Sequence, residues 1–201
     1  MNRRTTRRAV WIALAIAGLL IGGYVVFDQL YYVGKFGVVV PGELYRCRQP
    51  HGLQWSGIDR HDIRTVVNLK TEAEDPDVFA DERDLLAEKG VKLVHIPIKG
   101  LLPSYEQFER FVRSVRNSPR PALVHCEHGR NRTGFMAAAY LIVMQGWSAE
   151  RAMEDLELYE PWGDEYDAED AAKRKQLVAM LETIAAERAQ WRRRTAPAPE
   201  P

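Results

Sequence analysis

The chain begins with an apolar run that differs from everything after it. Residues 9–27 carry no charged side chain and are bounded by Arg8 and Asp28. At 1.5 Å per residue, a helix of this length crosses a hydrocarbon layer of roughly 30 Å. A buried core helix is rarely apolar on every face, and a cleaved signal peptide has a shorter apolar stretch before a small-residue cleavage site. The pattern therefore predicts an uncleaved transmembrane signal-anchor.

After this run, strand-like and helix-like patterns alternate along the chain. Short β-branched runs predict buried strands, and apolar residues at helical spacing predict amphipathic helices. The expected strands cover 38–40, 44–46, 65–69, 92–96 and 122–125, and the expected helices cover 79–89, 105–116, 133–144, 148–159 and 168–191. This alternation predicts an α/β fold with a central, mostly parallel sheet flanked by helices.

These patterns divide the chain into an anchor, one folded domain and short connecting or terminal segments. The domain is long enough to bury a proper core. The expected boundaries are a basic cytoplasmic N-terminus over 1–8, the anchor over 9–27, a linker over 28–36, the folded domain over 37–192 and a disordered Pro-rich tail over 193–201.

The charge distribution refines this picture. The formal net charge is zero, with 28 Lys and Arg against 28 Asp and Glu, but four arginines precede the apolar run. By the positive-inside rule, the N-terminus stays in the cytoplasm and the domain lies on the extracytoplasmic side, which is the periplasm of a bacterium. Residues 9–191 hold 21 basic and 27 acidic residues, a net charge of −6. A surface of this charge disfavours nucleic acid as a partner.

Cysteine and histidine usage excludes two further classes. Two cysteines are too few for a disulfide scaffold or a Cys-rich zinc module. His51, His61 and His95 show no spacing typical of a metal site, so we expect no metal and no cofactor.

One segment carries residues suited to chemistry. Residues 125–134 read His-Cys-Glu-His-Gly-Arg-Asn-Arg-Thr-Gly between an expected strand and an expected helix. Backbone N–H groups at a helix N-terminus form an anion cradle, and their positive field stabilises the thiolate of Cys126 as a nucleophile. Arg132 can hold two phosphate oxygens at once. The expected phosphate-binding residues are Cys126, Glu127, His128, Gly129, Arg130, Asn131 and Arg132.

The Cys-x5-Arg loop resembles that of the cysteine-dependent phosphatases, particularly the bacterial dual-specificity and tyrosine phosphatases. Residues 41–50, 63–69 and 95–98 also resemble segments of these enzymes, so the resemblance covers about residues 37–160. It implies a phosphotyrosine phosphatase-like fold and hydrolysis of phosphorylated proteins through a cysteinyl-phosphate, without a cofactor. In this family, a hydroxyl at the position of Thr133 assists release of the intermediate. A histidine at the position of His125 orients the loop. The Arg-Thr-Gly ending favours a phosphatase over a rhodanese-like sulfurtransferase.

The general acid departs from the family pattern. Most members carry an aspartate after the segment that corresponds to 95–98, whereas residues 91–125 contain none. Glu106 is our candidate, although a carboxylate in a first helical turn also stabilises the helix. Other candidates are Glu109, Glu127, His128, Asp75 and Asp77. A general acid contributes about 10²–10⁴-fold, so its absence slows the reaction without abolishing it.

Three alternative functions remain open. The loop also fits the HCxHGxNRTG pattern of metazoan-type RNA 5′-triphosphatases, whose diphosphate leaving group needs less protonation, but the acidic domain weighs against this substrate. Phosphoinositide phosphatases usually have a more basic loop, and Arg130 is the extra cation here. A phosphate-binding module without an acid is the third alternative, although intact Cys126 and Arg132 favour an enzyme.

The second cysteine, Cys47, allows two interpretations. It could pair with Cys126 as a reversible redox guard, which would protect a thiolate in an oxidising compartment. Alternatively, it is a small buried residue.

Overall fold

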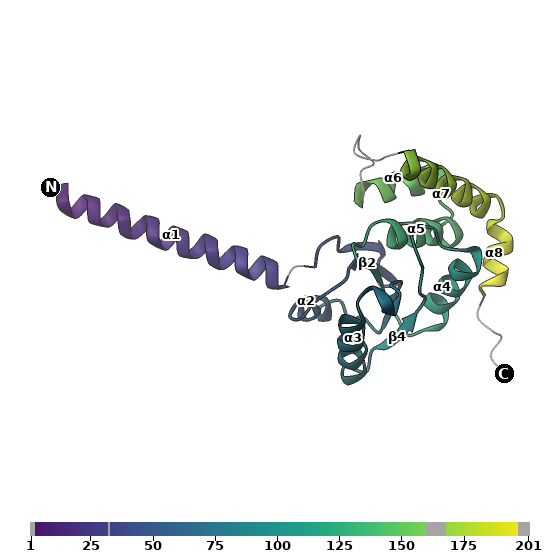
Figure 1. Ribbon diagram of the computed structural model, residues 1–201, viewed down its shortest axis with the longest axis horizontal. Helices are drawn as coiled ribbons and strands as arrows, with labels where there is room; N and C mark the ends of the chain where they lie inside the picture. Colours follow the sequence, from purple (N-terminus) through teal and green to yellow (C-terminus); the bar gives the residue numbers. More distant parts are fainter. Residues whose placement is uncertain (1–2, 32, 160–167, 197–201) are drawn as a thin grey trace.

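The N-terminal helix α1 (Arg3–Tyr31) projects away from a layered α/β domain (Figure 1). The computed structural model describes residues 3–31, 33–159 and 168–196. The apolar stretch Val10–Phe27 within α1 is long enough to cross a bilayer, and none of it is buried. An exposed stretch of this length that is apolar on every face fits a membrane anchor or a signal sequence.

A five-stranded mixed sheet forms the centre of the domain. Its strands, in chain order, are β1 (Gly37–Val40), β2 (Leu44–Arg48), β3 (Thr65–Asn68), β4 (Lys92–His95) and β5 (Ala122–Cys126). The spatial order is β1-β2-β5-β3-β4, with an antiparallel β1–β2 hairpin and three parallel pairs. His125 is paired with both Cys47 and Asn68, so the carboxyl ends of β2, β3 and β5 meet at one edge. The prediction of a mostly parallel sheet is confirmed.

The helices follow the expected pattern with four differences, one of which is that the helix expected over 133–144 continues as a π-helix from Leu141. Those of the domain are α2 (Gln54–Asp59), the 3₁₀ helix η1 (Glu72–Glu74), α3 (Pro76–Glu88), α4 (Tyr105–Asn117), α5 (Asn131–Tyr140), the π-helix η2 (Leu141–Gln145), α6 (Ala149–Tyr159), α7 (Ala168–Ala186) and α8 (Arg188–Arg194). The sequence pattern missed α2 and η1, which are only one or two turns long. The segment expected as one helix over 168–191 is two helices that meet at Glu187.

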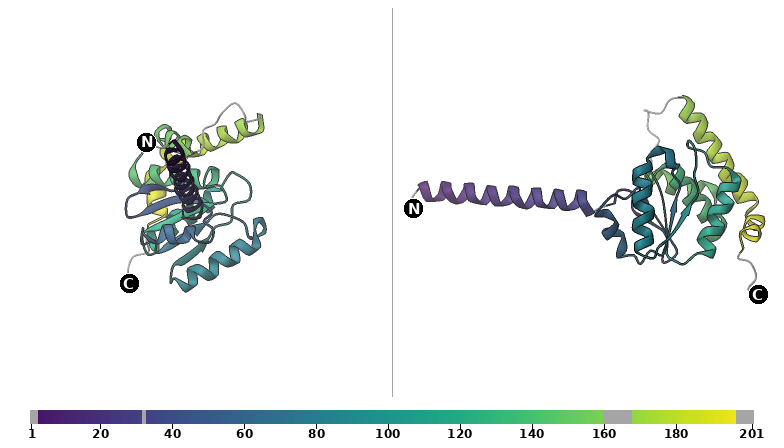
Figure 2. Two further views of the ribbon diagram at one scale, coloured as in Figure 1. Left: turned by 90° about the vertical axis from the view of Figure 1, so that its left-hand side faces the viewer. Right: turned by 60° about the horizontal axis from the view of Figure 1, so that its bottom comes forward.

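Helices cover both faces of the sheet because apolar residues occur at successive positions of its central strands. Val66 and Leu123 face the layer formed by α2 and α3, whereas Val67 and Val124 face α4 to α8. Successive side chains of a strand point to opposite faces, so buried runs of this kind require cover on both sides. Figure 2 shows the strands between these two helical layers.

The chain that follows α1 packs against the domain. Val33 is 4% exposed, and the Phe36 ring stacks on His61 with 4.5 Å between ring centroids. Lys35 Nζ donates a hydrogen bond of 2.7 Å to the carbonyl of Tyr159 at the end of α6. Residues 33–36 of the segment expected as a linker are therefore integrated into the domain.

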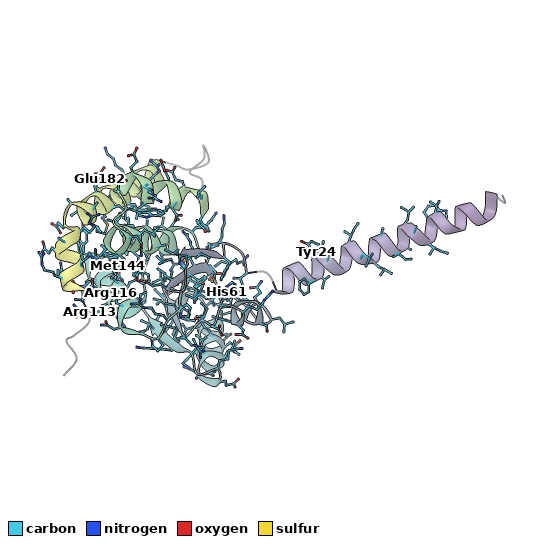
Figure 3. The ribbon with its side chains drawn as sticks, turned by 180° about the vertical axis from the view of Figure 1, so that it is seen from behind. Tyr24, His61, Arg113, Arg116, Met144 and Glu182 are labelled. Atoms are coloured by element: carbon cyan, nitrogen blue, oxygen red, sulfur yellow. The ribbon has the colours of Figure 1, made fainter. Side chains whose placement is uncertain are left out.

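Two arginines of α4 hold the C-terminal end of α8. Arg113 donates to the carbonyl of Arg194 at 2.9 Å, and Arg116 donates to the carbonyl of Arg192 at 3.0 Å (Figure 3). The last carbonyls of a helix have no partner within it and attract cations. Two residues of the expected tail, 193 and 194, thus belong to α8, while 1–2 and 197–201 lie outside the described residues.

Candidate active site

The Cys-x5-Arg segment forms a loop between β5 and α5. β5 ends at Cys126, α5 begins at Asn131, and residues 127–130 connect them. Gln49, directly after β2, donates its backbone N–H to the carbonyl of Glu127 at 3.2 Å. The strand–loop–helix arrangement places the first N–H groups of α5 at the loop, which is the geometry of an anion cradle.

A buried arginine supports this loop from the neighbouring strand. Arg46, on β2, is 1% exposed and donates a hydrogen bond of 2.9 Å from its NH2 group to the carbonyl of Gly129. Its guanidinium also lies 3.8 Å from the ring centroid of Tyr159 and 3.9 Å from Asp155. Burial lowers the pKa of Arg46, and Tyr159 and Asp155 oppose this effect. Arg46 therefore links β2, the loop and α6.

Gly129 is required by both its conformation and its close packing. Its φ is +66°, and a Cβ atom there would lie 2.6 Å from the backbone of Cys47 and Arg48. We expect Gly129→Ala to lower the free energy of unfolding by about 2–4 kcal/mol, from backbone strain and overpacking together. Denaturant unfolding measures this, and turnover should fall as the loop moves away from β2.

Gly42→Ala is the matched control for that substitution. Gly42 has a nearly identical φ of +69°, but a Cβ atom there would meet nothing within 4 Å. Gly42→Ala should lower the free energy of unfolding only by the strain of a left-handed residue, about 1–2 kcal/mol, and should leave turnover unchanged. Equal losses in the two variants would contradict the packing argument.

Arg132 is held by an acidic residue that lies far from it in sequence. Its NH1 and NH2 groups donate to Glu74 Oε1 and Oε2 at 2.7 and 2.9 Å, and NH1 also donates to the carbonyl of Ile98 at 3.2 Å. Burial acts to lower the pKa of Arg132, but the hydrogen bond to Glu74 and the charges of Cys126 and Glu74 raise it. The guanidinium is thus a fixed cation beside Cys126.

The remaining donors of Arg132 match a phosphate. A guanidinium has five N–H groups in a planar fork. Glu74 accepts from two of them and Ile98 from a third. The two that remain, on Nε and NH2, form a side-on pair that can bind two oxygens of one phosphoryl group. Arg132 can therefore bind phosphate without releasing Glu74.

Glu74 is itself rigidly placed. It ends η1, where its Oε1 accepts hydrogen bonds from the backbone N–H and the hydroxyl of Thr71 at 3.0 and 3.1 Å. The hydrogen bond from Arg132, together with those from Thr71, lowers the pKa of Glu74 to about 2. The carboxylate is therefore ionised at every pH at which such an enzyme would work.

Comparisons with known proteins agree with this geometry. A family model described as "DSP-PTPase phosphatase fused to NAD+ Kinase" matches residues 43–175, which is more than half of the chain. The chain belongs to this DSP-PTPase phosphatase family. The dual specificity protein phosphatase TpbA of Pseudomonas aeruginosa is 31% identical over 131 residues, which cover 64% of this chain and 56% of TpbA. The mRNA-capping enzyme of Mus musculus is 33% identical over 98 residues, 45% of this chain and 16% of that enzyme.

Solved structures give the same result for the fold. The core catalytic domain of the PP-IP phosphatase SIW14 from S. cerevisiae aligns with a TM-score of 0.63 at 23% identity, over 83% of this chain and 98% of that one. TpbA aligns with a TM-score of 0.53 at 30% identity, over 73% of this chain and 88% of TpbA. A cysteine-to-serine form of TpbA in complex with phosphotyrosine aligns with a TM-score of 0.54 at 29% identity. The alignment covers 73% of this chain and 87% of that one. The phosphotyrosine phosphatase-like fold is therefore confirmed.

In this DSP-PTPase member, the other residues expected at the site occupy the end of β5, the loop and the first turn of α5. Thr133 is fully buried, and its hydroxyl has no hydrogen-bond partner among the described residues; the same holds for Asn131 Oδ1. Glu127 pairs with Lys70, whose side chain is 3% exposed. His128 is exposed on the loop. His125 is fully buried, and its Nε2 lies 2.8 Å from Glu82 Oε1.

The structure places the candidate acids in different environments. Glu106 lies in the first turn of α4 and lines a surface hollow with Glu109, Arg110, Arg113 and Arg194. Asp75 caps α3 by accepting from the backbone N–H of Val78 at 3.3 Å. The acidic residue that contacts Arg132 is Glu74, which no local sequence pattern distinguishes from its acidic neighbours Asp75 and Asp77. A role for Glu106 as the acid stays a prediction.

The two cysteines lie on opposite faces of the sheet. Cys47 is opposite His125 in the register, so these two side chains point to one face and that of Cys126 points to the other. Accordingly, Cys47 packs with Val66 and Leu123, and burial raises the pKa of its thiol well above the ordinary value. A disulfide to Cys126 would require rearrangement of the strands, so this geometry favours the interpretation of Cys47 as a buried core residue.

No metal centre is formed by the part of the chain that the structure describes. No group of three or more His, Cys, Asp or Glu residues there has the arrangement of a metal site.

Proposed function

We propose that this phosphatase hydrolyses phosphotyrosine in proteins, and phosphoserine or phosphothreonine as a dual-specificity enzyme, through a cysteinyl-phosphate. The observation that carries the proposal is Arg132, whose side-on donors lie next to Cys126 while Glu74 fixes its opposite edge. A fork of this kind stabilises the equatorial oxygens of a transferring phosphoryl group.

The proposed reaction has two displacements at phosphorus. Cys126 Sγ bonds to phosphorus as the bond to the ester oxygen breaks, and the leaving oxygen takes up a proton. Water then bonds to phosphorus, the S–P bond breaks, and inorganic phosphate leaves with the thiolate restored. The buried, unpartnered hydroxyl of Thr133 is suited to donate a hydrogen bond to that departing thiolate.

The charges around the loop favour a phosphate monoester as substrate. Lys70 is paired with Glu127, and Arg132 is flanked by Glu74, so these cations add no second phosphate site. Polyphosphates and phosphoinositides would meet these carboxylates at close range. The phosphotyrosine complex of TpbA supports the same substrate class.

A second candidate is hydrolysis of an RNA 5′-triphosphate. The match to the mouse mRNA-capping enzyme, which covers 45% of this chain, supports it. The net charge of −6 over residues 9–191 opposes it, since polyanion binding depends on a basic surface.

For the location, we propose that α1 anchors the enzyme in a cell membrane, with the N-terminus cytoplasmic and the domain extracytoplasmic. Arginines at positions 3, 4, 7 and 8 precede Val10–Phe27, which is the charge bias that sets this orientation. An alkaline phosphatase fused to the C-terminus should be active in a bacterial host. An inactive fusion at normal expression would contradict this orientation.

The substrate proposal is tested with the full chain in detergent micelles. Phosphate release is measured from a phosphotyrosine peptide, phosphoserine and phosphothreonine peptides, a triphosphate-ended oligonucleotide and a phosphoinositide. We expect the phosphotyrosine peptide to have the highest kcat/KM. Turnover of the oligonucleotide alone would support the second candidate, and binding of phosphate without any turnover would identify a phosphate-binding module.

A further inference from the structure

The Cys-x5-Arg loop carries a carboxylate directly after its cysteine. Glu127 follows Cys126 in the chain, so their Cα atoms are about 3.8 Å apart. A phosphoryl group held at Cys126 Sγ therefore lies on the order of 10 Å from the Glu127 carboxylate. Two negative groups at this separation repel each other appreciably in the reduced dielectric of a protein. A loop that binds phosphate thus requires the charge of Glu127 to be compensated.

The compensating charge comes from a buried lysine. Lys70, two residues after the end of β3, forms an ion pair with Glu127. The side chain of Lys70 is 3% exposed, whereas that of Glu127 is 35% exposed. A buried ammonium group is costly unless an opposite charge is close, so Lys70 is strongly bound to this partner. The carboxylate still meets water on its other side.

The backbone of Lys70 is fixed on both sides of its Cα atom. Its N–H donates to Asn68 Oδ1 at 2.7 Å, and its carbonyl oxygen lies 2.7 Å from His95 Nε2. The preceding residue, Leu69, donates its N–H to the carbonyl of His125 at 2.9 Å. These contacts hold the start of the Lys70 side chain at the end of β5, from which the loop begins.

Glu127 is consequently held from both strands that flank β5. Gln49, directly after β2, donates its backbone N–H to the carbonyl of Glu127 at 3.2 Å. Lys70, after β3, holds the carboxylate. The first residue of the loop is therefore fixed in position through its backbone and neutralised through its side chain.

The two arginines that support the loop are matched by carboxylates of their own. Arg132 is bound by Glu74, and Arg46 lies 3.9 Å from Asp155. Removal of the buried lysine would leave the loop carboxylate without its partner and would shift the charge around the bound phosphate toward negative.

We propose that Lys70 is a positioning residue that neutralises Glu127 and thereby allows the loop to accept a doubly charged phosphoryl group. Lys70 acts through Glu127 and does not itself contact the substrate. This inference rests on the proposed function, in which the loop binds the phosphoryl group of the substrate. It adds to that function a residue from outside the Cys-x5-Arg segment.

The test is the affinity of Lys70→Met for inorganic phosphate. Isothermal titration is carried out on the full chain in detergent micelles, under mildly alkaline conditions in which phosphate is a dianion. Methionine keeps an unbranched apolar stem but has no charge, so the dissociation constant should rise by about tenfold. The value of kcat/KM for the phosphotyrosine peptide should fall by a similar factor. An unchanged dissociation constant in folded Lys70→Met would overturn the proposal.

A double variant distinguishes neutralisation from a merely structural role. In Lys70→Met/Glu127→Gln both charges are absent, so the dissociation constant should return to within about threefold of that of the unmodified enzyme. If the ion pair only held the loop in shape, the double variant would bind phosphate as weakly as Lys70→Met. That result would overturn the proposal.

Glu127→Gln covers the case in which Lys70→Met does not fold, because the Glu127 side chain is partly exposed. It removes the repelling charge, so it should bind phosphate at least as tightly as the unmodified enzyme, and weaker binding would overturn the proposal. Lys89→Met is the matched control, since it breaks the ion pair with Asp59 just before β4, at the opposite end of the parallel strands. It should leave the dissociation constant unchanged.

These titrations separate the inference from the proposed function. Phosphate binding does not require turnover, so the affinities can fail to follow this pattern while phosphatase activity is confirmed. Conversely, a chain that shows the expected affinities but hydrolyses no phosphorylated peptide would contradict the proposed function and leave the role of Lys70 in place.

Discussion

Replacing Cys126 by serine is expected to reduce turnover by about 10⁴-fold or more while leaving the fold intact. A serine hydroxyl stays protonated at neutral pH, and the side chain of the neighbouring His125 points to the opposite face of the sheet, where it contacts Glu82. Sγ and Oγ differ little in size, so the 3% exposed site should accept the change. Steady-state kinetics with the phosphotyrosine peptide measure the loss.

The same variant should still bind phosphate because Arg132 and the loop amides are unchanged. Binding is measured by isothermal titration with inorganic phosphate, and rapid acid quench of the unmodified enzyme should trap a phosphoryl group on the Cys126 peptide. Cys47→Ser is the matched control, since its side chain faces the opposite layer of the domain. Normal turnover by Cys126→Ser would show that another group is the nucleophile.

Replacing Arg132 by lysine should lower kcat/KM by about 10³-fold. Lysine keeps the positive charge but loses the planar fork, so it cannot bind Glu74 and two phosphate oxygens together. The defect should appear in kcat and in phosphate affinity, which distinguishes it from that of Cys126→Ser. Retention of phosphate affinity by Arg132→Lys would contradict the bidentate arrangement.

Glu74→Gln is the informative companion to Arg132→Lys. It preserves the shape of the side chain but removes its charge, so we expect Arg132 to be less well aligned and kcat to fall by about tenfold. If Glu74 instead competed with phosphate for Arg132, the variant would bind phosphate more tightly than the unmodified enzyme. That result would contradict the count of free donors on Arg132.

Acidification does not release Glu74 within the working range of pH. Because its pKa is depressed in the folded state, its stabilising contribution is complete above the ordinary glutamate value and declines as the pH falls toward about 2. A change in the activity profile between pH 5 and 8 therefore cannot be assigned to this residue.

The sequence predicted those parts of the fold that depend on local patterns. The strand at β3 follows from a β-branched run, and the helix expected over 105–116 is α4, which Ser104 caps with Gln107 completing a capping box. The Cys-x5-Arg loop was also predictable because Cys126 and Arg132 are only six residues apart. In each case, neighbouring residues determine the structure among themselves.

The partners of the loop were not predictable in this way. Glu74 is 58 residues from Arg132, and Glu82 is 43 residues from His125. Both lie in an acidic, helix-forming stretch in which many positions look alike in the sequence. Only the placement of η1 and α3 beside the sheet edge distinguishes these two carboxylates from their exposed neighbours.

The packing of residues 33–37 determines where this chain can be shortened. Val33 is buried, the carbonyl of Gly34 accepts from the backbone N–H of Arg48, and Gly37 packs so closely on Tyr159 that a Cβ atom would lie 1.9 Å from its hydroxyl. Tyr159 in turn stacks on Arg46, which holds the Cys-x5-Arg loop. A water-soluble fragment for crystallisation should therefore begin at or before Val33, because a later start removes a brace of the loop together with the hydrophobic helix.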